Sequence, residues 1–134
     1  MTAENFYTHF VEFSNLLDVI IPDVVIFEKP VYDSKSLASG YKVIETMGVQ
    51  KCLLQKKNIN YFEVSPTEVK YQIAGTGKAN KEDVKNSIIA KNLYTESKII
   101  EDIKQNSQFN YKKELQYHLW DAIAIGFTYL KKHE

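Results

Sequence analysis

Four consecutive apolar residues, Val24 to Phe27, limit the possible folds of this 134-residue chain more than any other stretch. A strand with one face in water alternates apolar and polar side chains, whereas a strand covered on both faces does not. Strands of the second kind lie inside sheets that carry helices on both sides. The run therefore predicts an α/β fold with this strand in the interior of the sheet.

Helical periodicity on both sides of this strand supports the same fold class. An amphipathic helix is predicted over residues 4–20, and a long helix from Leu37 to about Lys57. A second short strand is predicted at residues 61–64. Two strands alone make a marginal sheet in water, so we expect the sheet to be incomplete. The apolar stripe of the first helix consists of Phe6, Phe10, Phe13, Leu17 and Ile20.

The second half of the chain is predicted to be helical. Pro66 suits the first position of a short helix, with Val69 and Ile73 facing inward. Asn80 with Asp83 three residues later forms the pattern of a capping box, which predicts the start of another helix. A strong closing helix is predicted over residues 114–132, whereas residues 95–113 are polar with only a weak helical pattern.

Length and composition are those of a globular domain. A chain of this length, with 44% hydrophobic and 25% charged residues, predicts one domain over residues 1–134. No apolar run approaches the roughly 20 residues of a membrane span, and the first residues lack the pattern of a signal peptide. The single Cys52 fits a reducing cytoplasm and is expected to be a buried small apolar residue.

The net charge is zero, but its distribution along the chain is uneven. Residues 1–34 hold one Lys and six acids, a net charge of −5, and residues 35–134 hold 16 Lys and 11 acids, a net charge of +5. A basic part beside an acidic part fits a DNA surface next to a metal site. All 17 basic residues are Lys, which excludes bidentate guanidinium contacts to guanine and leaves phosphates and DNA shape to be recognised.

Three residues are candidates for a metal site. Glu28 follows the apolar strand directly, at the sheet edge where open α/β folds bind ligands. His118 and Asp121 lie three residues apart on the closing helix and so project from one face. Carboxylates suit Mg²⁺, and Mn²⁺ also accepts imidazole. Taken singly, these residues fit equally a solvated carboxylate and a surface His–Asp pair.

Three stretches of the chain resemble, in order, signature blocks of the RuvC Holliday-junction resolvase family of the ribonuclease H-like superfamily. They are VVIFEKPVY, SPTEVKYQIAGTGKANKEDV and HLWDAIAIG. In that family a buried strand ends in a catalytic Glu, and an acidic or His residue precedes Asp-Ala-hydrophobic-Ala by three positions. The middle block is the most specific, and the resemblance covers about residues 5–130. Its matching residues are Pro66, Val69, Lys70, Gly75, Gly77, Ala79, Lys81 and Val84.

The resemblance implies a structure-specific endodeoxyribonuclease that resolves Holliday junctions or other branched DNA in recombination and repair. It implies hydrolysis of a phosphodiester with Mg²⁺ or Mn²⁺, and a homodimer formed through the helix at residues 37–57. Glu28, His118 and Asp121 would be the catalytic metal ligands. His118 stands where many members of the family have Asp.

The resemblance also implies DNA contacts. Lys70, Lys78 and Lys81 would contact phosphates, although each also fits a solvated surface lysine. Tyr32 would correspond to an aromatic wedge that enters the junction, but its spacing from Glu28 is one residue longer than the family pattern, and it fits a packing aromatic equally. Residues 75–78 lack the spacing of a nucleotide-binding P-loop, which excludes that alternative.

The chain departs from the family pattern at its start. The family begins with a strand carrying Asp followed by Gly, and two further strands come before the helix that corresponds to residues 5–20. We therefore expect an N-terminally incomplete fold, a few-stranded sheet flanked by helices, and impaired cleavage by this chain alone. The alternatives are a non-catalytic junction-binding remnant of a RuvC-like nuclease and a chain whose true start lies upstream.

Overall fold

The computed structural model describes residues 3–31, 37–95, 97–98, 101, 105 and 113–134. The chain forms two compact units, residues 1–63 and residues 64–134. Among the described residues, no helix is both long enough and apolar enough to span a membrane. The weakly patterned segment 95–113 falls mostly outside the described residues, and the single-domain expectation for residues 1–134 stays a prediction.

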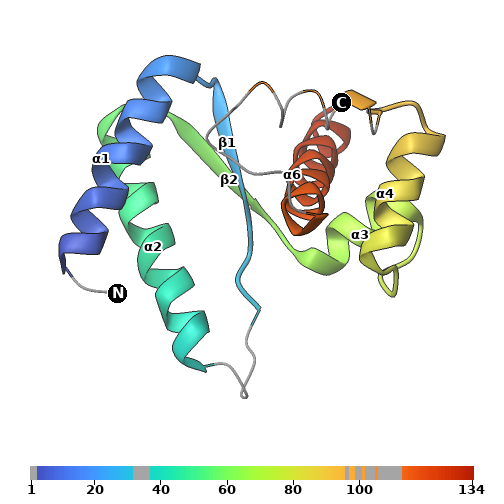
Figure 1. Cartoon of the computed structure of the whole chain (residues 1–134), viewed down its shortest axis with the longest axis horizontal. Coiled ribbons are helices and arrows are strands. Elements are labelled where there is room, and N and C mark those ends of the chain that lie inside the picture. The colour runs from blue at the N-terminus through green and yellow to red at the C-terminus, as the bar shows by residue number, and fades with distance from the viewer. Residues whose placement is uncertain (1–2, 32–36, 96, 99–100, 102–104, 106–112) are drawn as a thin grey trace. The chain divides into compact units, whose positions relative to one another are not determined.

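The described residues of the first unit form helices α1 and α2 and almost all of a small sheet. Helix α1 spans Ala3–Ile20, strand β1 Val24–Glu28, helix α2 Leu37–Lys56 and strand β2 Asn60–Val64. The two strands are neighbours in a two-stranded parallel sheet, and α1 lies along α2 (Figure 1). The predicted order of helix, strand, helix and strand is confirmed, as is the α/β fold class.

The core of the first unit lies where α1 and α2 meet one face of the sheet. Leu17 on α1 and Leu53 and Leu54 on α2 are buried there. Burying each leucine contributes about 1.5–3 kcal/mol relative to an exposed side chain. This cluster therefore fixes both helices against the strands. The half-buried side chains packed on it are Phe10, Phe13, Val25, Phe27 and Ile59.

Three burial predictions for this unit are wrong. All four residues from Val24 to Phe27 are half-buried rather than buried, because β1 pairs with one strand, β2, among the described residues and the core cluster of this unit packs on one face of the sheet. Ile20 is 60% exposed at the end of α1, where the chain leaves the core cluster. Cys52 is exposed, because it lies about 100° around α2 from the buried Leu53.

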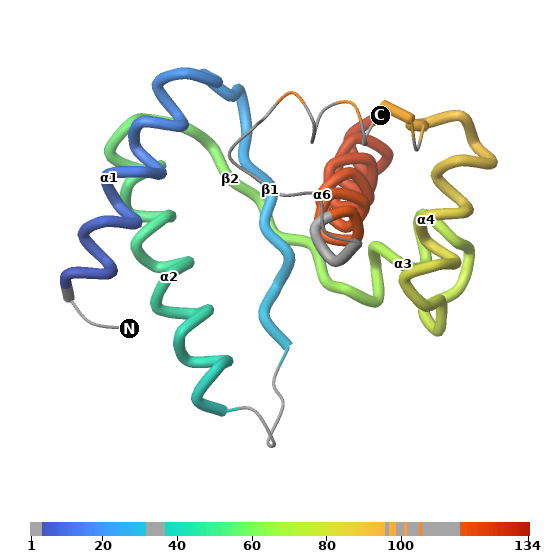
Figure 2. Tube along the Cα trace, in the orientation of Figure 1, coloured from blue at the N-terminus to red at the C-terminus, as the bar shows by residue number. Residues whose placement is uncertain are grey.

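In the described part of the second unit, helices α3, α4 and α6 pack on one another. Helix α3 spans Pro66–Ala74, helix α4 Lys81–Ala90 and helix α6 Lys113–Lys132, and each contacts the other two (Figure 2). Val69 and Ile73 face inward, as predicted from their spacing. Among the described residues of this unit beyond β2, the buried apolar ones are Val69, Ile73, Ala79, Val84, Ile88, Trp120 and Ala124.

Reciprocal side-chain caps begin α3 and α4. Ser65 Oγ accepts a hydrogen bond of 3.2 Å from the backbone N–H of Glu68, whose carboxylate accepts one from the N–H of Ser65. Asn80 and Asp83 exchange the same pair of bonds at 2.8 and 2.9 Å, which confirms the predicted capping box. A cap of this kind contributes about 1 kcal/mol, so both helix starts are fixed locally.

The loop between α3 and α4 depends on two glycines. Gly75 ends α3 with φ of 80°, a left-handed conformation that glycine adopts without steric cost. Gly77 lies so close to α3 that a β-carbon there would come within 2.9 Å of Thr67 Cγ2. Ala79 is buried just before α4 begins. The loop is therefore held against α3, and its path places Lys78 on the surface.

Candidate functional site

Glu28 is the last residue of β1 and is exposed. Alternate side chains of a strand point to opposite faces, and Val25 and Phe27 pack on the core cluster with α1 and α2. Glu28 therefore shares the other face of the sheet with Val24 and Ile26. This placement leaves its carboxylate outside the core of the first unit, at the carboxyl end of a strand.

His118 and Asp121 lie on the outer side of α6. The side of this helix that faces α3 and α4 is a buried row at four-residue spacing, Gln116, Trp120, Ala124 and Thr128. At 100° per residue His118 is roughly opposite this row and is exposed, and Asp121 is half-buried at its margin. The imidazole and the carboxylate thus occupy one stretch of the helix surface outside the core of the second unit.

The buried row holds α6 rigidly behind this pair. Trp120 is 1% exposed, and its ring meets the ring of Tyr94 edge-on with centroids 6.3 Å apart. The hydroxyl of Thr128, which is fully buried, donates a hydrogen bond of 2.8 Å to the carbonyl of Ala124. A site built on such a helix keeps its side chains in fixed directions.

The three predicted metal ligands come from different units. Glu28 belongs to the first unit, and His118 and Asp121 belong to the second. The structure brings the latter two together on one stretch of α6, and their meeting with Glu28 stays a prediction. Within either unit taken alone, no three His, Cys, Asp or Glu side chains of the described residues are grouped to hold a metal ion.

The predicted DNA-binding lysines all lie in the second unit. Lys78 is exposed in the loop before α4, and Lys81 is exposed as the first residue of that helix. The N-terminal end of a helix attracts phosphate through its backbone N–H groups and its dipole, which favours the same role for both lysines. Lys70 is half-buried on α3. Tyr32 lies outside the described residues.

The structure adds a link that no sequence pattern indicated. The hydroxyl of Tyr117 donates a hydrogen bond of 2.7 Å to Glu82 Oε2. Glu82 lies in the first turn of α4 beside Lys81, and Tyr117 is the residue before His118. The two partners are 35 residues apart, so only packing of α4 on α6 reveals the pair. The link holds the lysine-bearing end of α4 to the helix that carries His118.

Comparison with known protein families shows which family this chain belongs to. Residues 3–129 match the family model described as crossover junction endodeoxyribonuclease RuvC. The chain belongs to the RuvC family. This confirms the resemblance drawn from the three signature blocks, because the match spans all of them.

Curated RuvC proteins of bacteria match part of the chain. The crossover junction endodeoxyribonuclease RuvC of Pseudothermotoga lettingae is 35% identical over 77 residues, which are 58% of this chain and 47% of that protein. The protein of the same name from Brachyspira hyodysenteriae is 42% identical over 69 residues, 52% of this chain and 41% of that protein. These alignments span about half the length of the curated relatives.

Solved RuvC structures share the fold. The structure titled Thermus thermophilus RuvC matches with a TM-score of 0.61 at 21% identity, covering 93% of this chain and 63% of that one. The structure of T. thermophilus RuvC in complex with a Holliday junction substrate matches with a TM-score of 0.66 at 24% identity, covering 93% of this chain and 66% of that one. The fold class predicted from the sequence, an α/β fold of the RuvC type, is therefore confirmed.

Proposed function

We propose that this chain supplies the main part of a metal-dependent endodeoxyribonuclease that cuts four-way junctions or other branched DNA during recombination and repair. The observation that carries the proposal is the match of residues 3–129 to the RuvC family model. The exposed positions of Glu28 and His118 support it, because a site that acts on DNA must be open to a large substrate. Such an enzyme would act in the cytoplasm.

The proposed donor set fits a divalent cation. Glu28 and Asp121 offer carboxylate oxygens, the ligands that Mg²⁺ prefers, and His118 offers an imidazole nitrogen, which Mn²⁺ accepts more readily. When bound, such a cation polarises a phosphodiester and stabilises the negative charge that develops during its hydrolysis. We therefore assign Mg²⁺ or Mn²⁺ as the cofactor, held by Glu28, Asp121 and His118.

The chain's own residues orient the DNA around this site. Lys78 and Lys81, exposed at the start of α4, would bind phosphates, with Lys70 nearby on α3. His118 would act as a ligand or accept a proton from the attacking water. Tyr32 would enter the junction as a wedge. With no Arg in the chain, recognition rests on phosphate charge and DNA shape rather than on base edges.

The proposed site needs one more carboxylate. The family pattern places an Asp on the first strand of the sheet, which comes before the helix that corresponds to α1. We assign that Asp to residues other than these 134, on the same polypeptide or on another one. The apolar, half-buried β1 fits a further strand beside it, because it is paired only with β2 among the described strands and carries no charged or Pro residue from Val24 to Phe27.

The proposed enzyme is a homodimer formed through α2. Leu37, Tyr41 and Ile44 lie at helical spacing on one side of α2 and are 41%, 63% and 55% exposed. An exposed apolar stripe of this kind is typical of an interface. Replacing Ile44 by Glu should convert a dimer to a monomer in analytical ultracentrifugation, whereas the matched surface change Lys42→Glu should not.

The test uses the 134-residue chain with a synthetic four-way junction. We expect junction binding, binding of Mn²⁺ measured by calorimetry, and little cleavage. Adding a segment that carries an apolar strand ending in Asp-x-Gly should restore metal-dependent cleavage. Glu28→Gln and Asp121→Asn should then abolish cleavage and weaken Mn²⁺ binding while junction binding persists, whereas Asp23→Asn, an exposed carboxylate just before β1, should change neither.

Three results would contradict the proposal. Cleavage that survives in Glu28→Gln would remove Glu28 from the site. Junction binding that is unaffected by Glu28→Gln, with no Mn²⁺ binding and no cleavage under any condition, would identify the chain as a non-catalytic junction binder. Efficient cleavage by the 134-residue chain alone would show that no further carboxylate is needed.

A further inference from the structure

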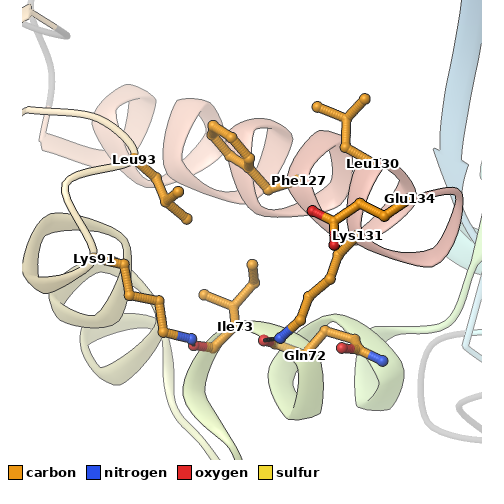
Figure 3. A pocket seen from close by; sticks show the side chains of 8 residues that line it. All are labelled: Gln72, Ile73, Lys91, Leu93, Phe127, Leu130, Lys131 and Glu134. Atoms are coloured by element: carbon orange, nitrogen blue, oxygen red, sulfur yellow. Dashed lines mark hydrogen bonds between the residues drawn. The ribbon is translucent and has the colours of Figure 1, made fainter.

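The second unit contains a cleft whose lining includes none of the proposed nuclease residues. It has a volume of about 390 Å³ and opens between the C-terminal end of α3, the segment after α4 and the last turns of α6 (Figure 3). Its size falls in the range of small-molecule sites. The lining residues are Gln72, Ile73, Lys91, Leu93, Phe127, Leu130, Lys131 and Glu134.

The interior of the cleft is apolar. Ile73 is buried at its base, and Leu93 and Phe127 are half-buried along its sides. Leu130 reaches its edge and is 57% exposed. Figure 3 shows Ile73 on α3 and Leu93 on the segment after α4 pointing toward the middle of the cleft, with Phe127 and Leu130 extending from α6. An apolar body of a ligand would therefore lose water contact on several sides.

Two ammonium groups lie beside this apolar interior. Lys91 Nζ donates a hydrogen bond of 2.6 Å to the carbonyl of Ile73, and Lys131 Nζ donates one of 3.4 Å to the carbonyl of Gln72. These bonds bring both lysines to the end of α3, where the helix carbonyls need donors. An ammonium carries three N–H donors, so each lysine keeps donors beyond the one given to its carbonyl.

The carboxylate side chain of Glu134 also lines the cleft. Figure 3 shows the side chain of Glu134 extending from the end of α6 over the cleft. The side chains of the lining carry two positive charges, on Lys91 and Lys131, and one negative charge, on Glu134. The cleft is thus complementary to one further anion, and Glu134 would compete with it.

We propose that this cleft binds a small carboxylate with an aromatic or aliphatic body. The body fills the space beside Leu93, Phe127 and Leu130, and the carboxylate accepts hydrogen bonds from Lys91 and Lys131. The proposal is independent of the nuclease proposal, because Glu28, His118 and Asp121 do not line the cleft. It assigns this end of the second unit to a small-molecule ligand.

The test titrates the full chain with 4-phenylbutyrate and, as a neutral match, 4-phenylbutanamide, followed by NMR of side-chain methyl groups. The acid should shift the methyl signals of Ile73, Leu93 and Leu130, and the amide should bind much more weakly. Lys91→Gln and Lys131→Gln should each weaken binding roughly tenfold, because a hydrogen bond to a charged group is lost. Glu134→Gln should tighten it by removing the competing charge.

Lys132→Gln is the matched control. Lys132 lies next to Lys131 on α6 but pairs with Glu68 at 2.7 Å, away from the cleft lining. Its loss should leave the affinity unchanged. Equal binding of acid and amide, or an equal loss in Lys132→Gln and Lys131→Gln, would overturn the proposal. Contacts between the phenyl ring and Leu93 in nuclear Overhauser spectra of the unmodified chain test the location without any variant, and their absence would also overturn it.

Discussion

Tyr117 on α6 and Glu82 in the first turn of α4 are joined by a hydrogen bond of 2.7 Å from the tyrosine hydroxyl to the carboxylate. A hydrogen bond to a charged group contributes about 1.5–3 kcal/mol to stability. This bond is exposed to solvent, so we expect its contribution to be smaller. We expect Tyr117→Phe to lower the free energy of unfolding by about 0.5–1 kcal/mol. Urea denaturation measures this change.

A matched variant separates the bond from the ring of Tyr117. Glu82→Gln keeps a side-chain oxygen that can accept the hydrogen bond from the Tyr117 hydroxyl, so it should cost less stability than Tyr117→Phe. If both variants leave the urea midpoint unchanged, the bond does not hold α4 to α6 in solution.

Replacing Ile21 by Gly should stabilise the folded protein. It has φ of 49°, a left-handed conformation that costs a residue other than glycine about 1–2 kcal/mol. Its side chain is 77% exposed, so little packing is lost. We expect Ile21→Gly to raise the free energy of unfolding by about 0.5–1 kcal/mol, measured by thermal or urea denaturation. The control Val19→Gly, at an 81% exposed position within α1, should destabilise instead.

Core truncations should reveal whether residues 1–134 unfold as one domain. Leu54 in the first unit and Ile88 in the second are both fully buried, and each change to Ala should cost about 2–5 kcal/mol. If the chain is one cooperative domain, both variants should shift the same single transition in calorimetry. Two transitions, with Leu54→Ala moving one and Ile88→Ala moving the other, would contradict the single-domain prediction.

His118→Asp should change the preference between metals. An additional carboxylate favours Mg²⁺, whereas imidazole is accepted better by Mn²⁺. We therefore expect the ratio of affinity for Mg²⁺ to that for Mn²⁺ to rise in this variant, as measured by calorimetric titration. His133→Asp, on an exposed residue after α6, should leave that ratio unchanged. An unaltered ratio in His118→Asp would exclude His118 as a ligand.

Lys78→Gln should weaken binding to a four-way junction uniformly across DNA sequences. Loss of one phosphate contact should reduce the slope of log affinity against log salt by about 1. Fluorescence anisotropy at several salt concentrations measures this slope. Lys132→Gln, which removes a lysine paired with Glu68, should leave the slope unchanged, and an equal effect of both variants would mean that Lys78 contributes only general charge.

The sequence predicted only those features of the candidate site that depend on the spacing of residues within one helix or strand. His118 and Asp121 share a stretch of α6 because a three-residue separation on a helix places side chains on one side. Glu28 lies at the carboxyl end of β1 because it follows the apolar run directly. We inferred from the family blocks that these three residues serve one site. This stays a prediction, because Glu28 belongs to one unit and His118 and Asp121 belong to the other.

The features that were predicted correctly from the sequence are those set by residues close together in the chain. The capping pair Asn80 and Asp83 and the inward positions of Val69 and Ile73 follow from interactions within a few residues, so the pattern contains them. Only the tertiary structure revealed three other features. They are the exposure of Cys52, the half-burial of Val24 to Phe27, and the cleft that both Lys91 and Lys131 line. Each of these features depends on which face of a helix or strand is covered by another segment. Such segments are tens of residues apart in the chain, so a local sequence pattern does not predict their contact.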